Sequence, residues 1–335
     1  MNIKENLNEG SNQYGKGLEF VSQGNIREAK SCFEKALDNG YRNYKVLTSL
    51  ALVEKALGNK RKTLELLVQA EEIKKNNSIA KILLLSEYMD QGRFHDVIRI
   101  ARQMEESYPE NYESFHAEIA ALVKLKNYDD ALNKLDSIQE TFGKQKTFVN
   151  DYIIVLHSLE RHDEAWEYFQ SKEAFFNKDS SEYLKIKAQL ASCLRKKQKA
   201  EEAFDKLYKN DKNSSAAISL ASLLIMDSKE AQADEYLQDI IRHRKAGRDY
   251  YFALFMHAQC LEKQNEEECL IKQAYKDAIC IYEEAYKNSK FNVYVMQLAA
   301  ECYEALGDIE NAERCRKLTQ EIRDALANNS KKDSE

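Results

Sequence analysis

Proline and glycine are scarce, with one proline and ten glycines in 335 residues. Sheet proteins use these residues at many turns, so their scarcity disfavours a fold built from strands. Long apolar runs are missing as well. No segment approaches the ~18 uncharged apolar residues that span a bilayer, and the first ten residues contain no apolar core of a secretory signal. The sequence therefore predicts a helical, cytoplasmic protein that does not insert into a membrane.

Paired cysteines and a positive charge balance are also lacking. The seven cysteines are odd in number, widely scattered and never spaced as CxxC, which favours free thiols in a reducing compartment. The formal net charge is −6 at pH 7, so the summed field opposes a phosphate backbone. Nucleic acid is therefore not expected as a partner.

Motifs for catalysis or metal binding are absent. The sequence contains no HExxH zinc motif, no GxxxxGK[ST] phosphate loop and no GxSxG nucleophile elbow. The pattern nearest to a metal cluster is His257 and Cys260, three residues apart, with Cys269 and Cys280 downstream. Structural zinc sites usually contain CxxC pairs, so we expect no metal. Because the catalytic and phosphate-binding motifs are also missing from the sequence, we expect no cofactor and no catalytic residues.

What the chain does contain is a repeat of 34 residues. Gly24, Gly58 and Gly92 are spaced at this interval, and each precedes a similar run such as GNIREAKSCFEKA. Two columns of residues follow the same period. The first column is Ala29, Thr63, Val97, Ala131 and Ala165, and the second is Phe33, Leu67, Ala101, Leu135 and Phe169. In the first three repeats a glycine lies where a helix would end and the chain reverse, and the two column residues follow it, four positions apart. This arrangement indicates packed helix pairs.

This pattern resembles the tetratricopeptide repeat. With position 1 at Gly10, the preferred positions 8, 11, 20, 24 and 27 hold Gly17, Phe20, Ala29, Phe33 and Ala36. The tryptophan that the family prefers at position 4 is never present. The resemblance implies an all-α fold, a right-handed superhelical α-solenoid of about nine helix-turn-helix repeats. We expect the repeats to begin near residues 10, 44, 78, 112, 146, 180, 214, 249 and 291.

The domain organisation follows from this register. We expect a flexible N-terminus over residues 1–9, a single solenoid over 10–327 and a disordered tail over 328–335. Within the solenoid, regular repeats cover 10–175, less regular repeats cover 180–290, and a capping repeat covers 291–327. In the last repeat Arg316 replaces the apolar residue of the second column, as suits a final helix with solvent on its outer face. The insertion at 264–272 either lengthens both neighbouring helices or forms a local excursion.

The resemblance also suggests a binding groove. In the family, first-helix residues at positions 2, 5, 9, 12 and 13 line a concave surface that holds a protein or peptide segment. Carried onto this chain, these positions form an apolar stripe whose candidate residues are Tyr14, Leu18, Leu52, Ile82, Met89, Val123 and Ile154. The alternative is that these side chains pack between neighbouring first helices of a tightly wound superhelix.

A basic stretch offers a second candidate site, composed of Lys185, Arg195, Lys196, Lys197 and Lys199. It is either a solvated helix face or a docking patch for an acidic partner. The sequence thus predicts a non-catalytic scaffold or adaptor that binds a protein or peptide segment in its groove. The alternatives are a regulatory peptide receptor and a chaperone or accessory subunit of a secretion or assembly complex. The sequence does not determine the partner, the pathway or whether the chain forms homo-oligomers.

Overall fold

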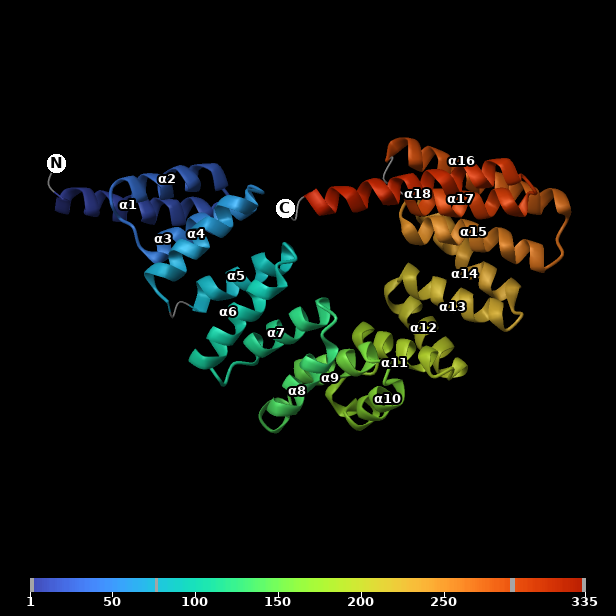
Figure 1. Ribbon diagram of the computed structural model, residues 1–335, viewed down its shortest axis with the longest axis horizontal. Coiled ribbons are helices and arrows are strands. Elements are labelled where there is room, and N and C mark those ends of the chain that lie inside the picture. Colours follow the sequence, from blue (N-terminus) through green and yellow to red (C-terminus); the bar gives the residue numbers. More distant parts are fainter. Residues whose placement is uncertain (1–2, 76–77, 290–292, 333–335) are drawn as a thin grey trace. The chain divides into compact units, whose positions relative to one another are not determined.

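The computed structural model describes residues 3–75, 78–289 and 293–332 (Figure 1). Within these ranges the regular elements are eighteen α-helices and one short 3-10 helix, without a strand. The chain divides into two compact units, unit 1 over Met1–Lys172 and unit 2 over Glu173–Glu335. No helix in the described part of the chain is long and apolar enough to cross a membrane.

Unit 1 contains five helix pairs. The first helices are α1 (Ile3–Ser22), α3 (Tyr44–Ala56), α5 (Ser78–Asp90), α7 (Tyr112–Lys124) and α9 (Lys146–Ser158). The second helices are α2 (Ile26–Asp38), α4 (Lys60–Ile73), α6 (Phe94–Ser107), α8 (Tyr128–Phe142) and α10 (His162–Ser171). Consecutive helices pack against each other along the unit.

Unit 2 contains four helix pairs after the 3-10 helix η1 (Glu173–Phe175). The first helices are α11 (Ser181–Cys193), α13 (Ser214–Met226), α15 (Arg248–Lys263) and α17 (Val293–Ala305). The second helices are α12 (Lys197–Asp211), α14 (Glu230–His243), α16 (Glu268–Asn288) and α18 (Ile309–Lys332). From the second repeat onward, every first helix begins within two residues of the start expected from the sequence.

The helices extend further at both ends than the solenoid was expected to. Residues 3–9, assigned to a flexible N-terminus, form the start of α1, and residues 328–332 of the expected tail form the end of α18. Neither segment contains proline, and both contain residues that favour a helix. Residues 1–2 and 333–335 lie outside the described part. The insertion lengthens both of its neighbours, since α15 has 16 residues and α16 has 21.

The turns inside the helix pairs share one backbone conformation. The central residue has a positive φ in every one of the nine turns within the described ranges, namely Gly24, Gly58, Gly92, Lys126, Glu160, Arg195, Ser228, Asn265 and Gly307. In the second turn, the N–H of Asn59 donates to the carbonyl of Glu54 at 2.9 Å, and the N–H of Gly58 donates to Lys55 at 3.0 Å. These are the two bonds of a Schellman motif, which satisfies the last carbonyls of the first helix. Five of the nine turns use a residue other than glycine and are therefore strained.

Replacing Lys126 by glycine should consequently stabilise the protein. The left-handed conformation at φ 62° costs a residue with a side chain roughly 1–2 kcal/mol, of which glycine recovers a part. We expect a gain of roughly 1 kcal/mol in the free energy of unfolding measured with urea. Gly58→Ala is the reverse control and should lose a similar amount, because a methyl group at Gly58 meets no atom within 4 Å and only backbone strain changes. A Lys126→Gly variant no more stable than the native chain would contradict this account.

The two sequence columns form the packed seam between the helices. All members of the first column are buried to 2% exposure or less, and the column continues as Ala203, Ala233, Ala278 and Ala312. The second column is equally buried through Leu207, Leu237 and Tyr282. Arg316, the last member, is exposed and pairs with Glu304. The exposure expected for the polar residue at this position is observed.

Candidate functional site

Large apolar side chains lie exposed along the first helices of unit 1. We call this set the first-helix face, and its members are Leu18, Val21, Leu52, Ile79, Ile82 and Ile154, each 41–58% exposed. Their neighbours on the same helices are core residues, as shown in α3 by Leu50 at 2% and Ala51 at 1%. The exposure of these side chains is therefore a property of one helix side, and they are not closed off inside the unit.

The structure places the seven predicted groove residues in two groups. Leu18, Leu52, Ile82 and Ile154 are 44–48% exposed and belong to the first-helix face. Tyr14, Met89 and Val123 are partly buried. Tyr14 packs between the rings of Phe33 and Tyr41, with centroid distances of 5.7 and 6.1 Å. Tyr14 thus packs against the second helix of its own repeat and the loop that follows it, so part of its side chain belongs to the core of unit 1.

A lysine on α3 ties the face to the next first helix. Lys55 Nζ lies 2.6 Å from Oε1 of Glu87, a buried residue of α5. The same ammonium lies 3.5 Å from Ser86 Oγ and 3.9 Å from Asp90 Oδ2. Because three groups of α5 meet one cation of α3, the helices that carry Leu52 and Ile82 are held side by side.

A histidine on α7 makes the equivalent link to α9. His116 Nδ1 and the Tyr112 hydroxyl both lie 2.7 Å from Oδ2 of Asp151, which is 6% exposed. The hydrogen bond from His116 to this carboxylate raises the pKa of the imidazole above its ordinary value, against the opposing effect of burial. The charged form of His116 is thus favoured in the folded state, and its contact with Asp151 connects repeats four and five.

The stability of the protein should therefore depend on pH through His116. A raised pKa in the folded state contributes stability that is fully present below the unfolded value of about 6.5 and is lost as the pH rises through the folded value. The native chain should lose stability over this interval relative to His116→Gln, whose side chain does not titrate. Urea unfolding from pH 5.5 to 8.5 measures the difference, and parallel curves for the two proteins would contradict the charged pair.

Buried carboxylates are the feature that sequence reasoning missed. Glu54 is fully buried in α3, and its Oε1 lies 3.0 Å from Lys30 Nζ and 2.9 Å from Lys62 Nζ. Burial alone would raise the pKa of Glu54, but hydrogen bonds from Asn59 and the two lysines hold it below its ordinary value. The available signal was an acid on the core side of a first helix with lysines on both neighbouring second helices.

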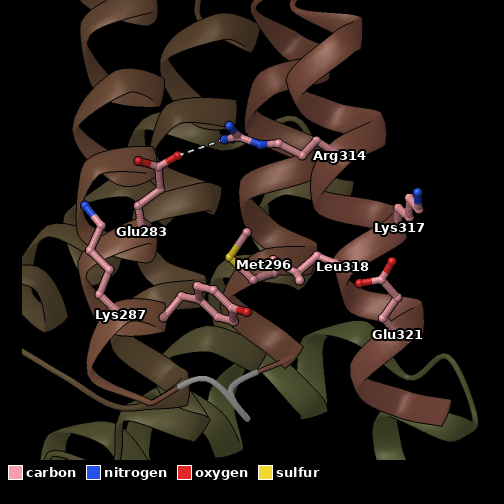
Figure 2. A pocket seen from close by; sticks show the side chains of 8 residues that line it. Glu283, Lys287, Met296, Arg314, Lys317, Leu318 and Glu321 are labelled. Carbon is pink, nitrogen blue, oxygen red and sulfur yellow. Dashed lines mark hydrogen bonds and ion pairs between the residues drawn. The ribbon is translucent and has the colours of Figure 1, made fainter. Parts of the chain in front are cut away.

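Unit 2 contains an open cleft of about 570 Å³ between α16, α17 and α18 (Figure 2). Met296 and Leu318 form its apolar part, while Lys287 and Lys317 carry charges at its edges. Glu283 accepts hydrogen bonds from Tyr303 at 2.8 Å and from Arg314 at 3.4 Å. The carboxylate of Glu283 is thus already hydrogen-bonded to side chains of the protein.

The comparisons with known proteins agree with this architecture. A family model described as tetratricopeptide repeat matches residues 14–62, which contain the C-terminal part of α1, all of α2 and α3, and the start of α4. The matched segment has the same turns and columns as the other helix pairs. Residues 14–62 thus match the tetratricopeptide repeat, and the described chain has the helix-pair fold of tetratricopeptide-repeat arrays.

A solved structure shows the same fold at low sequence identity. A tetratricopeptide repeat protein from Parabacteroides merdae is 15% identical, with a TM-score of 0.51, and the alignment covers 88% of this chain and 99% of that one. PilF from Pseudomonas aeruginosa is also 15% identical, with a TM-score of 0.48 and coverage of 63% and 96%. No curated protein matches the sequence.

Within the tetratricopeptide array, the predicted basic stretch lies on α11, the following turn and the start of α12. Lys197 pairs with Asp227, which also lies 3.9 Å from Lys229. Lys185 lines a cavity of about 320 Å³ between α11, α12 and α13, and Arg195 is the positive-φ residue of its turn. Lys197 is thus engaged in an ion pair, and Lys185 lines a separate cavity. Both observations weaken the case that the basic stretch forms one docking patch.

The histidine and cysteines of the nearest metal-like pattern have separate environments. His257 Nδ1 contacts Asp234 Oδ1, and Cys260 is fully buried. Burial raises the pKa of the Cys260 thiol to about 12. Cys269 and Cys280 are exposed on α16. The structure therefore does not assemble these four residues into a common site.

Proposed function

We propose that the protein is a non-catalytic scaffold that holds the apolar side of a protein segment on the first-helix face of unit 1. The observation that supports this function is the exposure of six large aliphatic side chains on the first helices α1, α3, α5 and α9. Aligned exposed apolar residues on a folded unit commonly mark interaction surfaces. The fold supports the general role, because stacked helix pairs present extended surfaces to partners.

The energetics require several anchors at once. Full burial of a leucine or isoleucine side chain stabilises a complex by roughly 1.5–3 kcal/mol, and half-exposed side chains gain part of that amount. Association costs an estimated 4–15 kcal/mol in lost freedom of motion. A segment that covers one or two residues of the face would therefore bind weakly, whereas one that spans α3 and α5 buries Leu52, Ile79 and Ile82 together. An amphipathic helix or extended strand with regularly spaced apolar residues fits this requirement.

Polar groups around the face set the rest of the specificity. Lys45 on α3 and Lys124 on α7 are exposed, as are Asp90 on α5 and Glu113 on α7. The apolar stripe is thus bordered by both signs of charge, which favours a segment with mixed charges beside its apolar residues. A regulatory receptor and an accessory subunit of an assembly complex would use the same surface and differ in the partner.

A peptide-display selection against the full-length protein tests the function. Selected peptides should share apolar residues at helical or alternating spacing, and Leu52→Asp should weaken their binding at least tenfold in a fluorescence titration. Lys197→Ala serves as the control for the basic stretch and should leave binding unchanged. Peptides that are uniformly acidic, bind Leu52→Asp normally and dissociate with salt would overturn the proposal and assign binding to a charged surface.

A further inference from the structure

The turn between α9 and α10 brings two histidines together. His157 lies in the last turn of α9, and His162 is the first residue of α10. Their ring centroids are 5.0 Å apart, and a ring nitrogen of each lies within 4.8 Å of the other's. The Schellman turn centred on Glu160, which reverses the chain between the two helices, sets this geometry.

Both imidazoles contain a nitrogen whose hydrogen-bonding capacity is unused. His157 Nδ1 and His162 Nδ1 are buried, and neither has a hydrogen-bond partner within the described part of the chain. A buried nitrogen of this kind is costly unless a group of the protein, a water molecule or an ion satisfies it. Here two such atoms belong to neighbouring rings whose centroids are 5.0 Å apart, so one bound species can satisfy both.

The surroundings favour a cation as this species. The adjoining sequence carries Glu160, Asp163 and Glu164 against a single cation, Arg161. Arg161 is engaged by Glu164 at 2.6 Å. The local charge balance therefore attracts a positive ion.

We propose that His157 and His162 bind a divalent transition-metal ion through their Nδ1 atoms. Neutral imidazole is a preferred ligand of zinc, copper and nickel ions. Zinc–nitrogen bonds of about 2.0–2.1 Å place two ligands of a tetrahedral ion roughly 3.4 Å apart, so the rings rotate slightly toward each other on binding. Water or further groups complete the coordination. The site clamps the end of α9 to the start of α10 in repeat five.

This inference differs from what the sequence suggested. The expectation of no metal depended on the missing CxxC and HExxH motifs, which describe ligands on one helix or one compact loop. His157 and His162 are five residues apart on two helices, and the positive-φ turn between these helices brings their tilted rings to a centroid distance of 5.0 Å.

Isothermal titration of the chelator-treated full-length protein with zinc sulfate tests the site. The native chain should bind one equivalent through the pair, and His157→Ala and His162→Ala should each weaken that binding at least tenfold. His95→Ala is the matched control, because His95 lies near the start of second helix α6, is exposed, and should not affect binding. Circular dichroism confirms that each variant is folded.

A second measurement reports on the ligand atoms in the native chain itself. In histidine-ring nitrogen NMR spectra of the native chain, zinc should shift the Nδ1 resonances of two rings, assigned by their loss in the two variants. Absence of binding would overturn the proposal and leave water as the species between the rings. Equally tight binding to the His157→Ala, His162→Ala double variant would also overturn it, by placing the ion on thiols elsewhere.

Discussion

Replacing Ile82 by glutamate should abolish the binding of a partner segment without unfolding the protein. Ile82 is 47% exposed near the middle of α5, between the helix ends and beside the α3–α5 link at Lys55. A partner would have to cover the new carboxylate with apolar surface, which adds a desolvation cost to the loss of an apolar anchor. Binding should weaken between tenfold and a thousandfold, since each 1.4 kcal/mol changes the dissociation constant tenfold.

The free energy of unfolding should change little in the same variant. Substitutions at exposed positions away from packed features usually shift stability by about 0.5 kcal/mol or less. Ile73→Glu is the matched control, because Ile73 is 48% exposed but lies at the end of second helix α4. Equal losses of binding in both variants would show that apolar exposure in general, and not the first-helix face, is responsible. An unfolded Ile82→Glu protein would show that Ile82 belongs to the core.

Replacing Tyr282 by alanine should produce the largest loss of stability. Tyr282 is fully buried in α16, and its hydroxyl donates to the Tyr251 carbonyl at 2.6 Å. Its ring also meets the ring of Tyr251 edge to face, with centroids 6.1 Å apart. Removing a buried ring of this size costs about 3–5 kcal/mol, because the cavity left behind closes only in part. Urea unfolding followed by circular dichroism measures the loss.

Two variants separate the contributions at this position. Tyr282→Phe keeps the ring and should lose only about 0.5–1.5 kcal/mol for the hydrogen bond. Tyr286→Ala removes the same side chain one turn further along α16, where it lines the cleft and is partly exposed. Its cost should be clearly smaller than that of Tyr282→Ala. If the two alanine variants lost equal stability, the second column would not be the main seam of the core in unit 2.

The fold was largely predictable because each repeat imposes the same local conditions. The period of 34 located the helix starts, and the two columns identified residues such as Ala29 and Phe33, which are fully buried. The insertion at 264–272 was not decidable, since its residues favour helices in either arrangement. The strain in turns such as those at Lys126 and Glu160 was also hidden, because the Schellman geometry persists where glycine is absent.

The candidate site was predictable only in part. Positional comparison with the tetratricopeptide family found the exposed residues Leu52 and Ile82, since exposure on a first helix follows from its helical phase. It also included Tyr14, which aromatic neighbours partly bury. The links that fix the spacing of the helices, such as Lys55 with Glu87, join side chains of different repeats. Their partners depend on how neighbouring helices rotate against each other, which a repeat pattern does not encode.

Photo-crosslinking at position 82 tests the central claim most directly. A benzophenone amino acid in place of Ile82, introduced in the cells that make the protein, should crosslink a defined partner when illuminated. The same amino acid at position 73 should not capture that partner, although the two native side chains are almost equally exposed. A partner captured equally well from both positions, or only from position 73, would contradict the assignment of binding to the first-helix face of unit 1.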